Sequence, residues 1–120
     1  MQDLAPDIFR QRLIMEGHWT IDMDADLVRG YLLGISAELH LTPYGEPVIF
    51  SPASGMGREE NAGFDSFLPL IDSGISGYFW SNARFFSVVV YSCTPFDADA
   101  AVSFTRGYLA IDGRIACSVF

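Results

Sequence analysis

The segment FDSFLPLIDSGISGYFWSNARFFSVVVYSC, residues 64–93, contains three apolar runs separated by short polar breaks. Aromatic and β-branched side chains fill the runs, so residues 64–71, 75–80 and 85–93 are predicted to be β-strands. The breaks at residues 72–74 and 81–83 are short enough to be turns between antiparallel strands. Pro69 has no N–H to donate to a ladder and therefore favours an edge or irregular position.

Two helices are expected on either side of this segment. Residues 24–39 carry an apolar side chain at every fourth position: Leu27, Tyr31, Ile35 and Leu39. This spacing predicts a helix that Asp22 or Asp24 caps. A second helix is expected from Asp97, whose carboxylate can cap it, to about Tyr108. Further strands are predicted at residues 12–21, 47–51 and 114–120.

These elements do not alternate strictly between strand and helix, which favours an α+β fold. We expect one domain over residues 1–120, with a mostly antiparallel sheet covered on one face by two helices. The other sheet face then needs a cover. Ten Phe, five Tyr and two Trp in a chain of 120 residues favour burial of that face in a homodimer.

The charge of the chain restricts its partners and its chemistry. A formal charge of -8 opposes binding to nucleic acids and anionic membranes. All seven basic residues other than histidine are Arg, which excludes a Schiff-base lysine and a P-loop lysine. The start of the chain lacks the features of a signal peptide, and no apolar run is long enough to span a bilayer. We therefore expect a cytoplasmic protein with a small-molecule substrate.

Several familiar motifs fail. Residues 22–26 resemble the start of a calcium loop, but Leu27 and Leu33 occupy its glycine and glutamate positions, so helix capping is the better interpretation. Two Cys and two His without close spacing do not predict a zinc site or a disulfide framework. The polar, glycine-rich residues 54–63 are predicted to form a loop. Within it, residues 54–58 lack a phosphate-loop fingerprint, which favours a plain loop over an anion site.

Residues 72–80 and 91–97 are the remaining candidates. Taken alone, Ser73 in a turn and Cys93 at a strand end are compatible with either a structural or a functional role. The segment resembles the small bacterial and archaeal S-adenosylmethionine decarboxylases, which carry acid-Ser-His-x-Ser-x-His-x-Trp-Pro-Glu and a Cys twenty residues after the first Ser. The corresponding residues here are Asp72, Ser73, Gly74, Ser76, Tyr78, Trp80, Ser81, Asn82 and Cys93. Met15-Glu16-Gly17 in the first strand also resembles the aromatic-Glu-Gly of larger relatives.

The resemblance implies a pyruvoyl-dependent carboxy-lyase of polyamine biosynthesis. In that family the precursor cleaves itself before the serine, and the resulting pyruvoyl group replaces pyridoxal phosphate as the electron sink. By similarity, cleavage would fall between Asp72 and Ser73, Ser73 would become the pyruvoyl cofactor, and Cys93 would return a proton to the product. The family fold pairs two sheets face to face in a homodimer.

Other positions follow from the same resemblance. Tyr78 replaces the histidine that assists processing, and Asp65 replaces the serine that assists the acyl shift. Residues implied to lie near substrate are Met15, Glu16, Trp80 and Asn82. Tyr has an ordinary pKa near 10 and is a weaker base than His at neutral pH.

Three hypotheses follow. The first is a decarboxylase acting on S-adenosylmethionine or a related amino acid. The second is an enzyme that binds S-adenosylmethionine and cyclises or cleaves it without a pyruvoyl group. The third is a non-catalytic homologue that binds a ligand or a partner.

Overall fold

The computed structural model describes residues 1–51 and 62–120. Its elements, in chain order, are β1 (Gln11–His18), α1 (Ala25–Glu38), β2 (Val48–Phe50), β3 (Gly63–Leu70), β4 (Ser73–Trp80), β5 (Phe85–Ser92), α2 (Ala98–Tyr108) and β6 (Ala116–Val119). The predicted loop at 54–63 lies outside the described residues except for its end, where Gly63 begins β3. The anion-loop alternative at 54–58 lies wholly outside them.

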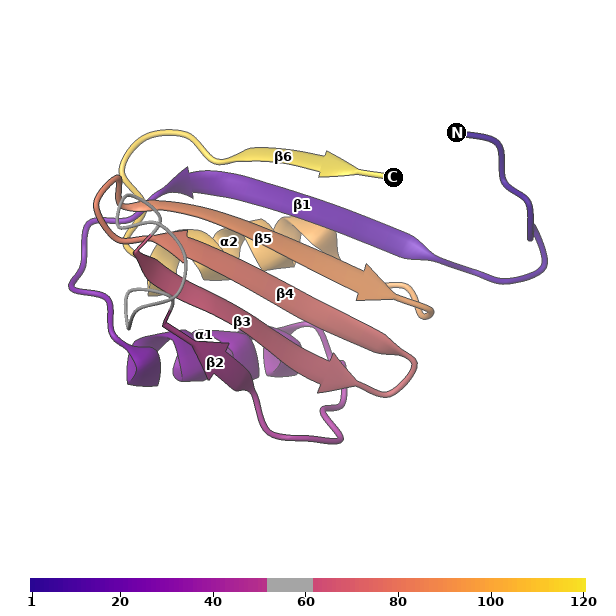
Figure 1. The fold of residues 1–120 in the computed structure, drawn as a ribbon. Coiled ribbons are helices and arrows are strands. Elements are labelled where there is room, and N and C mark those ends of the chain that lie inside the picture. The colour runs from indigo at the N-terminus through magenta and orange to yellow at the C-terminus, as the bar shows by residue number, and fades with distance from the viewer. Residues whose placement is uncertain (52–61) are drawn as a thin grey trace.

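Within the described residues, the strands form one antiparallel sheet in the order β2-β3-β4-β5-β1-β6. Both helices lie on one face of it (Figure 1). The expected α+β architecture is therefore confirmed. The three strands predicted from residues 64–93 are neighbours, and β1 adds to β5, so both chain ends reach the same side of the sheet (Figure 1).

The turn before β4 differs from the prediction. Only Ile71 and Asp72 form it, and Ser73 is already paired with Leu70 as the first residue of β4. Asp72, the second residue of the turn, has a φ of 57°, a left-handed conformation that Asp tolerates better than most residues. Because Asp72 supplies this conformation, Ser73 is free to extend the ladder.

Other boundaries also shift: the first strand, β1, ends at His18 and not at residue 21 as predicted. The last strand is limited to Ala116–Val119, shorter than the predicted 114–120. Pro69 lies in β3, which is an inner strand, but it lies beyond the residues that pair with β2. There the neighbour is irregular chain, and the Tyr44 N–H donates to the Pro69 carbonyl at 3.3 Å. The missing N–H of Pro69 therefore interrupts no regular ladder.

The helices and the sheet enclose a core centred on Tyr31 of α1. Tyr31 is fully buried, and its ring meets Phe79 of β4 edge-on at 6.3 Å and stacks on Phe104 of α2 at 6.0 Å. Its hydroxyl shares a 2.7 Å hydrogen bond with Thr105. This ring therefore connects both helices to the central strand that carries Ser73.

The burial of Tyr31 predicts a loss of stability at high pH. Desolvation raises the pKa of its hydroxyl well above the ordinary 10.0, an effect that the Thr105 hydrogen bond only partly offsets. Above pH 10 the unfolded chain releases this proton while the folded chain keeps it, so the free energy of unfolding falls by about 1.4 kcal/mol per pH unit. Urea unfolding from pH 9 to 11 measures the slope, and Tyr31→Phe should reduce it. An unchanged slope in that variant would refute this assignment.

Both helices end in the same hydrogen-bonded cap, with a left-handed residue that is not glycine. At the end of α2, Ala110 has a φ of 47°, and the Ile111 N–H donates to the Arg106 carbonyl at 3.1 Å. Glycine is the preferred residue at this position.

Ala110→Gly should therefore stabilise the protein. Removing the strained Cβ is expected to raise the free energy of unfolding by about 0.5–1 kcal/mol. Chemical denaturation measures this change. Ser103→Gly, at an exposed position inside α2, should lower it instead. A decrease in both variants would contradict the argument.

The sheet face opposite the helices, here called the open face, carries large apolar side chains in contact with solvent. Those on β2 to β5 that are at least 39% exposed are Val48, Phe50, Phe67, Tyr78 and Tyr91. No helix in the described ranges is long and apolar enough to cross a membrane. A ligand or partner that binds the open face therefore meets these exposed apolar side chains.

Candidate functional site

Ser73 and Cys93, twenty residues apart in the chain, meet at one end of the sheet. The Cys93 backbone N–H donates a hydrogen bond to Ser73 Oγ at 3.1 Å. Ser73 begins β4 and Cys93 directly follows β5, so the pairing of these two strands brings the residues together. Both are half-buried. The structure therefore brings together Ser73 and Cys93, the two residues that the sequence singled out, through the Cys93 backbone.

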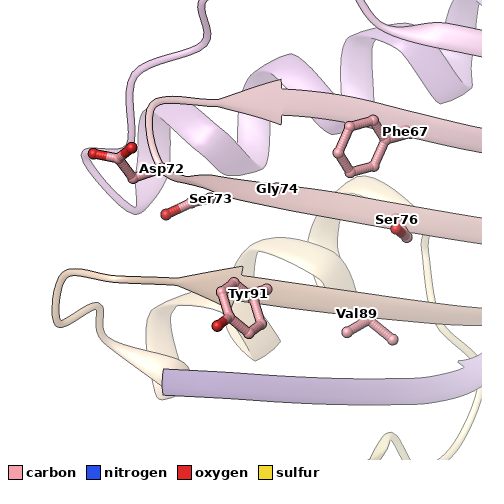
Figure 2. A pocket seen from close by; sticks show the side chains of 7 residues that line it. All are labelled: Phe67, Asp72, Ser73, Gly74, Ser76, Val89 and Tyr91. Atoms are coloured by element: carbon pink, nitrogen blue, oxygen red, sulfur yellow. The ribbon is translucent and has the colours of Figure 1, made fainter. Parts of the chain in front are cut away.

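A hollow of about 320 Å³ opens beside this contact on the open face. Its lining, shown in Figure 2, consists of Phe67, Asp72, Ser73, Gly74, Ser76, Val89 and Tyr91. The Phe67 ring lies over the backbone of Gly74, where a Cβ would come within 2.6 Å of it. Tyr91 is the partner of Gly74 on β5. Glycine at position 74 thus leaves room for an aromatic wall next to Ser73.

Four polar side chains form a continuous row across the open face, here called the polar row. Glu16 of β1 pairs with Ser87 of β5, Ser87 with Tyr78 of β4, and Tyr78 with Asp65 of β3. Directly paired residues have Cβ atoms about 5 Å apart, and the whole row spans about 14 Å. In the described part of the chain, neither carboxylate of the row forms an ion pair.

Ser87 was not predicted from the sequence. The available signal is its place in the apolar strand FFSVVVYS. Ser87 is a polar residue between buried Phe86 and Val88, so its side chain points to the opposite face of the sheet. Recognising it required the register with Tyr78, which the sequence does not provide.

The polar row is not adjacent to Ser73. Tyr78 follows Ser73 by five residues in a regular strand, a distance of about 16 Å along the sheet. Asp65 is paired with Tyr78 and is therefore equally remote. The carboxyl group nearest to Ser73 in the chain is that of Asp72, which lines the hollow. Asp65 and Tyr78, which occupy the two processing positions of the family, consequently lie next to each other but not beside the bond between Asp72 and Ser73.

Trp80 and Asn82 lie at the far end of β4. The Trp80 ring is 5.4 Å from Phe85, which is itself 5.4 Å from the ring of His18. Asn82 is exposed in the turn that follows. The three rings form an aromatic border beyond the polar row. Neither Trp80 nor Asn82 lines the hollow at Ser73.

Met15 does not reach this surface. It is completely buried under the helices, and its sulfur accepts a hydrogen bond from Thr105 Oγ1 at 3.7 Å. Since side chains alternate along β1, Met15 and Glu16 point to opposite faces of the sheet. The alternation that places Glu16 on the open face therefore removes Met15 from the candidate site.

The acidic run at residues 22–26 caps a helix. Asp24 caps α1 by accepting from the Leu27 N–H at 2.8 Å, as helix capping predicts. No group of three or more metal-binding side chains occurs among the described residues. Cys93 and Cys117 are both free thiols.

Comparison with known proteins bears on the fold alone. No protein-family model and no curated protein sequence matches this chain. Among solved structures, the adenosylmethionine decarboxylase from Aquifex aeolicus is similar, with a TM-score of 0.67 and 19% sequence identity over 94% of this chain and 89% of that one. The antiparallel sheet with two helices on one face is thus an adenosylmethionine decarboxylase-like fold.

Proposed function

We propose that this protein is a carboxy-lyase that acts on S-adenosylmethionine, or on a related amino acid, after cleavage between Asp72 and Ser73. The observation that carries this proposal is the contact between Ser73 Oγ and the Cys93 backbone beside the hollow. The fold shared with an adenosylmethionine decarboxylase supports it.

The surroundings of Ser73 fit the formation of a pyruvoyl group. The ladder between β3 and β4 continues from Gly63–Trp80 to Leu70–Ser73, so a break after Asp72 opens only the two-residue turn. In the acyl shift, Ser73 Oγ bonds to the Asp72 carbonyl carbon, the amide C–N bond breaks, and the hydroxyl proton moves to the Ser73 nitrogen. A base then removes the Ser73 α-proton and the bond from Ser73 Cβ to the ester oxygen breaks, so that Asp72 leaves with a free α-carboxylate and residue 73 becomes dehydroalanine. Tautomerisation to the imine and hydrolysis by water, with release of ammonia, leave the ketone. A pyruvoyl group supplies the electron sink for decarboxylation.

The other residues then have distinct tasks. Cys93, beside Ser73, is the candidate proton donor to the product carbon. Phe67 and Tyr91 supply apolar walls on both sides of Gly74, which restrict water near the reaction. Glu16 and Asp65 lie too far along the sheet to contact the reacting group, and their carboxylates favour the approach of a positively charged substrate to the open face.

A homodimer in which two open faces meet is part of this proposal. It would cover the exposed Phe67 and Tyr91 and enclose the hollow. Sedimentation velocity, compared between the native chain and a Phe67→Glu variant, measures whether this face associates.

The direct test of the activity uses S-adenosylmethionine labelled at its carboxyl carbon. Release of labelled CO₂ and a product lighter by the mass of CO₂ are expected, and prior treatment with borohydride, which reduces a ketone, should abolish both. A product that retains the carboxyl carbon would exclude decarboxylation.

The polar row favours a second candidate function, cyclisation or cleavage of S-adenosylmethionine without a pyruvoyl group. Such reactions need orientation and charge stabilisation at the sulfonium, which Tyr78, Asp65 and Glu16 supply without involving Ser73. If so, Tyr78→Phe and Asp65→Asn should stop product formation, whereas Ser73→Ala should leave it intact.

A further inference from the structure

A second hollow, of about 210 Å³, lies between the N-terminal segment and the start of β1. Its lining consists of Met1, Gln2, Asp3, Leu4, Arg10 and Arg12. Two of the seven arginines of an otherwise acidic chain thus border one small space.

Neither guanidinium is saturated by its contacts. Arg10 Nη2 donates to the carboxylate of Asp3, while Arg10 Nε is buried and has no partner in the part of the chain that is described. Arg12 Nε donates to the Phe120 carbonyl at 3.0 Å, and its guanidinium lies 5.2 Å from the centre of the Phe120 ring. Each guanidinium has five N–H donors, so most donors of the pair are left without a protein acceptor.

The charge balance of this hollow is positive. Asp3 is the one carboxylate in its lining, against two guanidinium groups. The pKa of Asp3 is lowered by its hydrogen bond from the Ala5 N–H and by Arg10, so this carboxylate is ionised at neutral pH and competes for Arg10. Asp3 therefore neutralises this site in part but not fully.

We propose that this hollow binds a phosphate group, either free or as a phosphomonoester. A tetrahedral phosphate offers acceptor oxygens in several directions and can bond to Arg10 and Arg12 together, whereas a planar carboxylate matches one guanidinium fork. The volume holds the phosphate with a few waters, since one water occupies about 30 Å³. The lining of this hollow shares no residue with that of the hollow at Ser73, although Arg12 pairs with Tyr91 across the strands, and the phosphate proposal does not depend on the proposed activity.

Titration of the full chain with inorganic phosphate, methyl phosphate and acetate at constant ionic strength, followed by calorimetry, tests the site. Phosphate should bind at millimolar or lower concentration and acetate more weakly. Arg12→Gln and Arg10→Gln should each weaken phosphate binding at least threefold, and Asp3→Asn should strengthen it about threefold, on the scale of an exposed ion pair. Arg106→Gln is the matched control, because Arg106 donates to the Gly113 carbonyl elsewhere.

Opposite effects of the Asp3 and arginine substitutions cannot arise from general destabilisation. If methyl phosphate binds as tightly as inorganic phosphate, the site is assigned to a phosphorylated molecule. If inorganic phosphate alone binds, the site is assigned to the free ion. The proposal would be overturned if acetate bound as tightly as phosphate, or if Arg106→Gln and Arg12→Gln lost the same phosphate affinity.

Discussion

Ser73→Ala is expected to leave a folded, uncleaved chain of 13.3 kDa with no decarboxylase activity. Alanine has no hydroxyl to attack the Asp72 carbonyl, so neither the cleavage nor the ketone forms. The fold should survive, because Ser73 makes one side-chain hydrogen bond, to a backbone N–H, and lies at the end of a strand. Denaturing mass spectrometry and the labelled-CO₂ assay measure the two losses.

Ser103→Ala is the matched control for this substitution. Ser103 is exposed on α2 and remote from the hollow, so its variant should cleave and turn over like the native chain. Cleavage that persists in Ser73→Ala would show that another residue initiates it, and the assignment of Ser73 would then be wrong.

Cys93→Ala is expected to separate cleavage of the chain from turnover of the substrate. The backbone N–H that bonds to Ser73 remains, so cleavage should continue. Turnover should fall by about 10²–10⁴-fold, the usual contribution of a positioned general acid. The product should also change, because a product carbon without its proton donor is open to side reactions.

Cys117→Ala provides the comparison for Cys93→Ala. Cys117 is the other cysteine of the chain and lies exposed on β6. Its removal should leave the rate unchanged. Equal rates for Cys93→Ala and the native chain would remove Cys93 from the chemistry while leaving the Ser73 proposal standing.

Much of the fold could be predicted from local sequence signals. Asp24 and Asp97 cap the helices as expected, since a carboxylate before an apolar periodic run is a local signal. The three strands of residues 64–93 were predicted from their aromatic and β-branched content. The turn before β4 begins one residue earlier and ends two residues earlier than predicted, because Asp, Ser and Gly all favour turns and only the backbone shows that Asp72 takes the left-handed position.

The site was less predictable, because it depends on strand register. The spacing of Ser73 and Cys93 identified a pair that the structure brings into contact. The same spacing suggested that Tyr78 assists at Ser73, but a regular strand separates them. Ser87 became visible only through its pairing with Glu16 and Tyr78. Sequence spacing thus identifies residues, whereas the pairing of strands decides which of them act together.

The mass of the purified native chain under denaturing conditions tests the central claim most directly. The proposal predicts two fragments, residues 1–72 and residues 73–120, with the second shifted by a carbonyl reagent such as hydroxylamine. A single chain of 13.3 kDa that does not react with this reagent would contradict it.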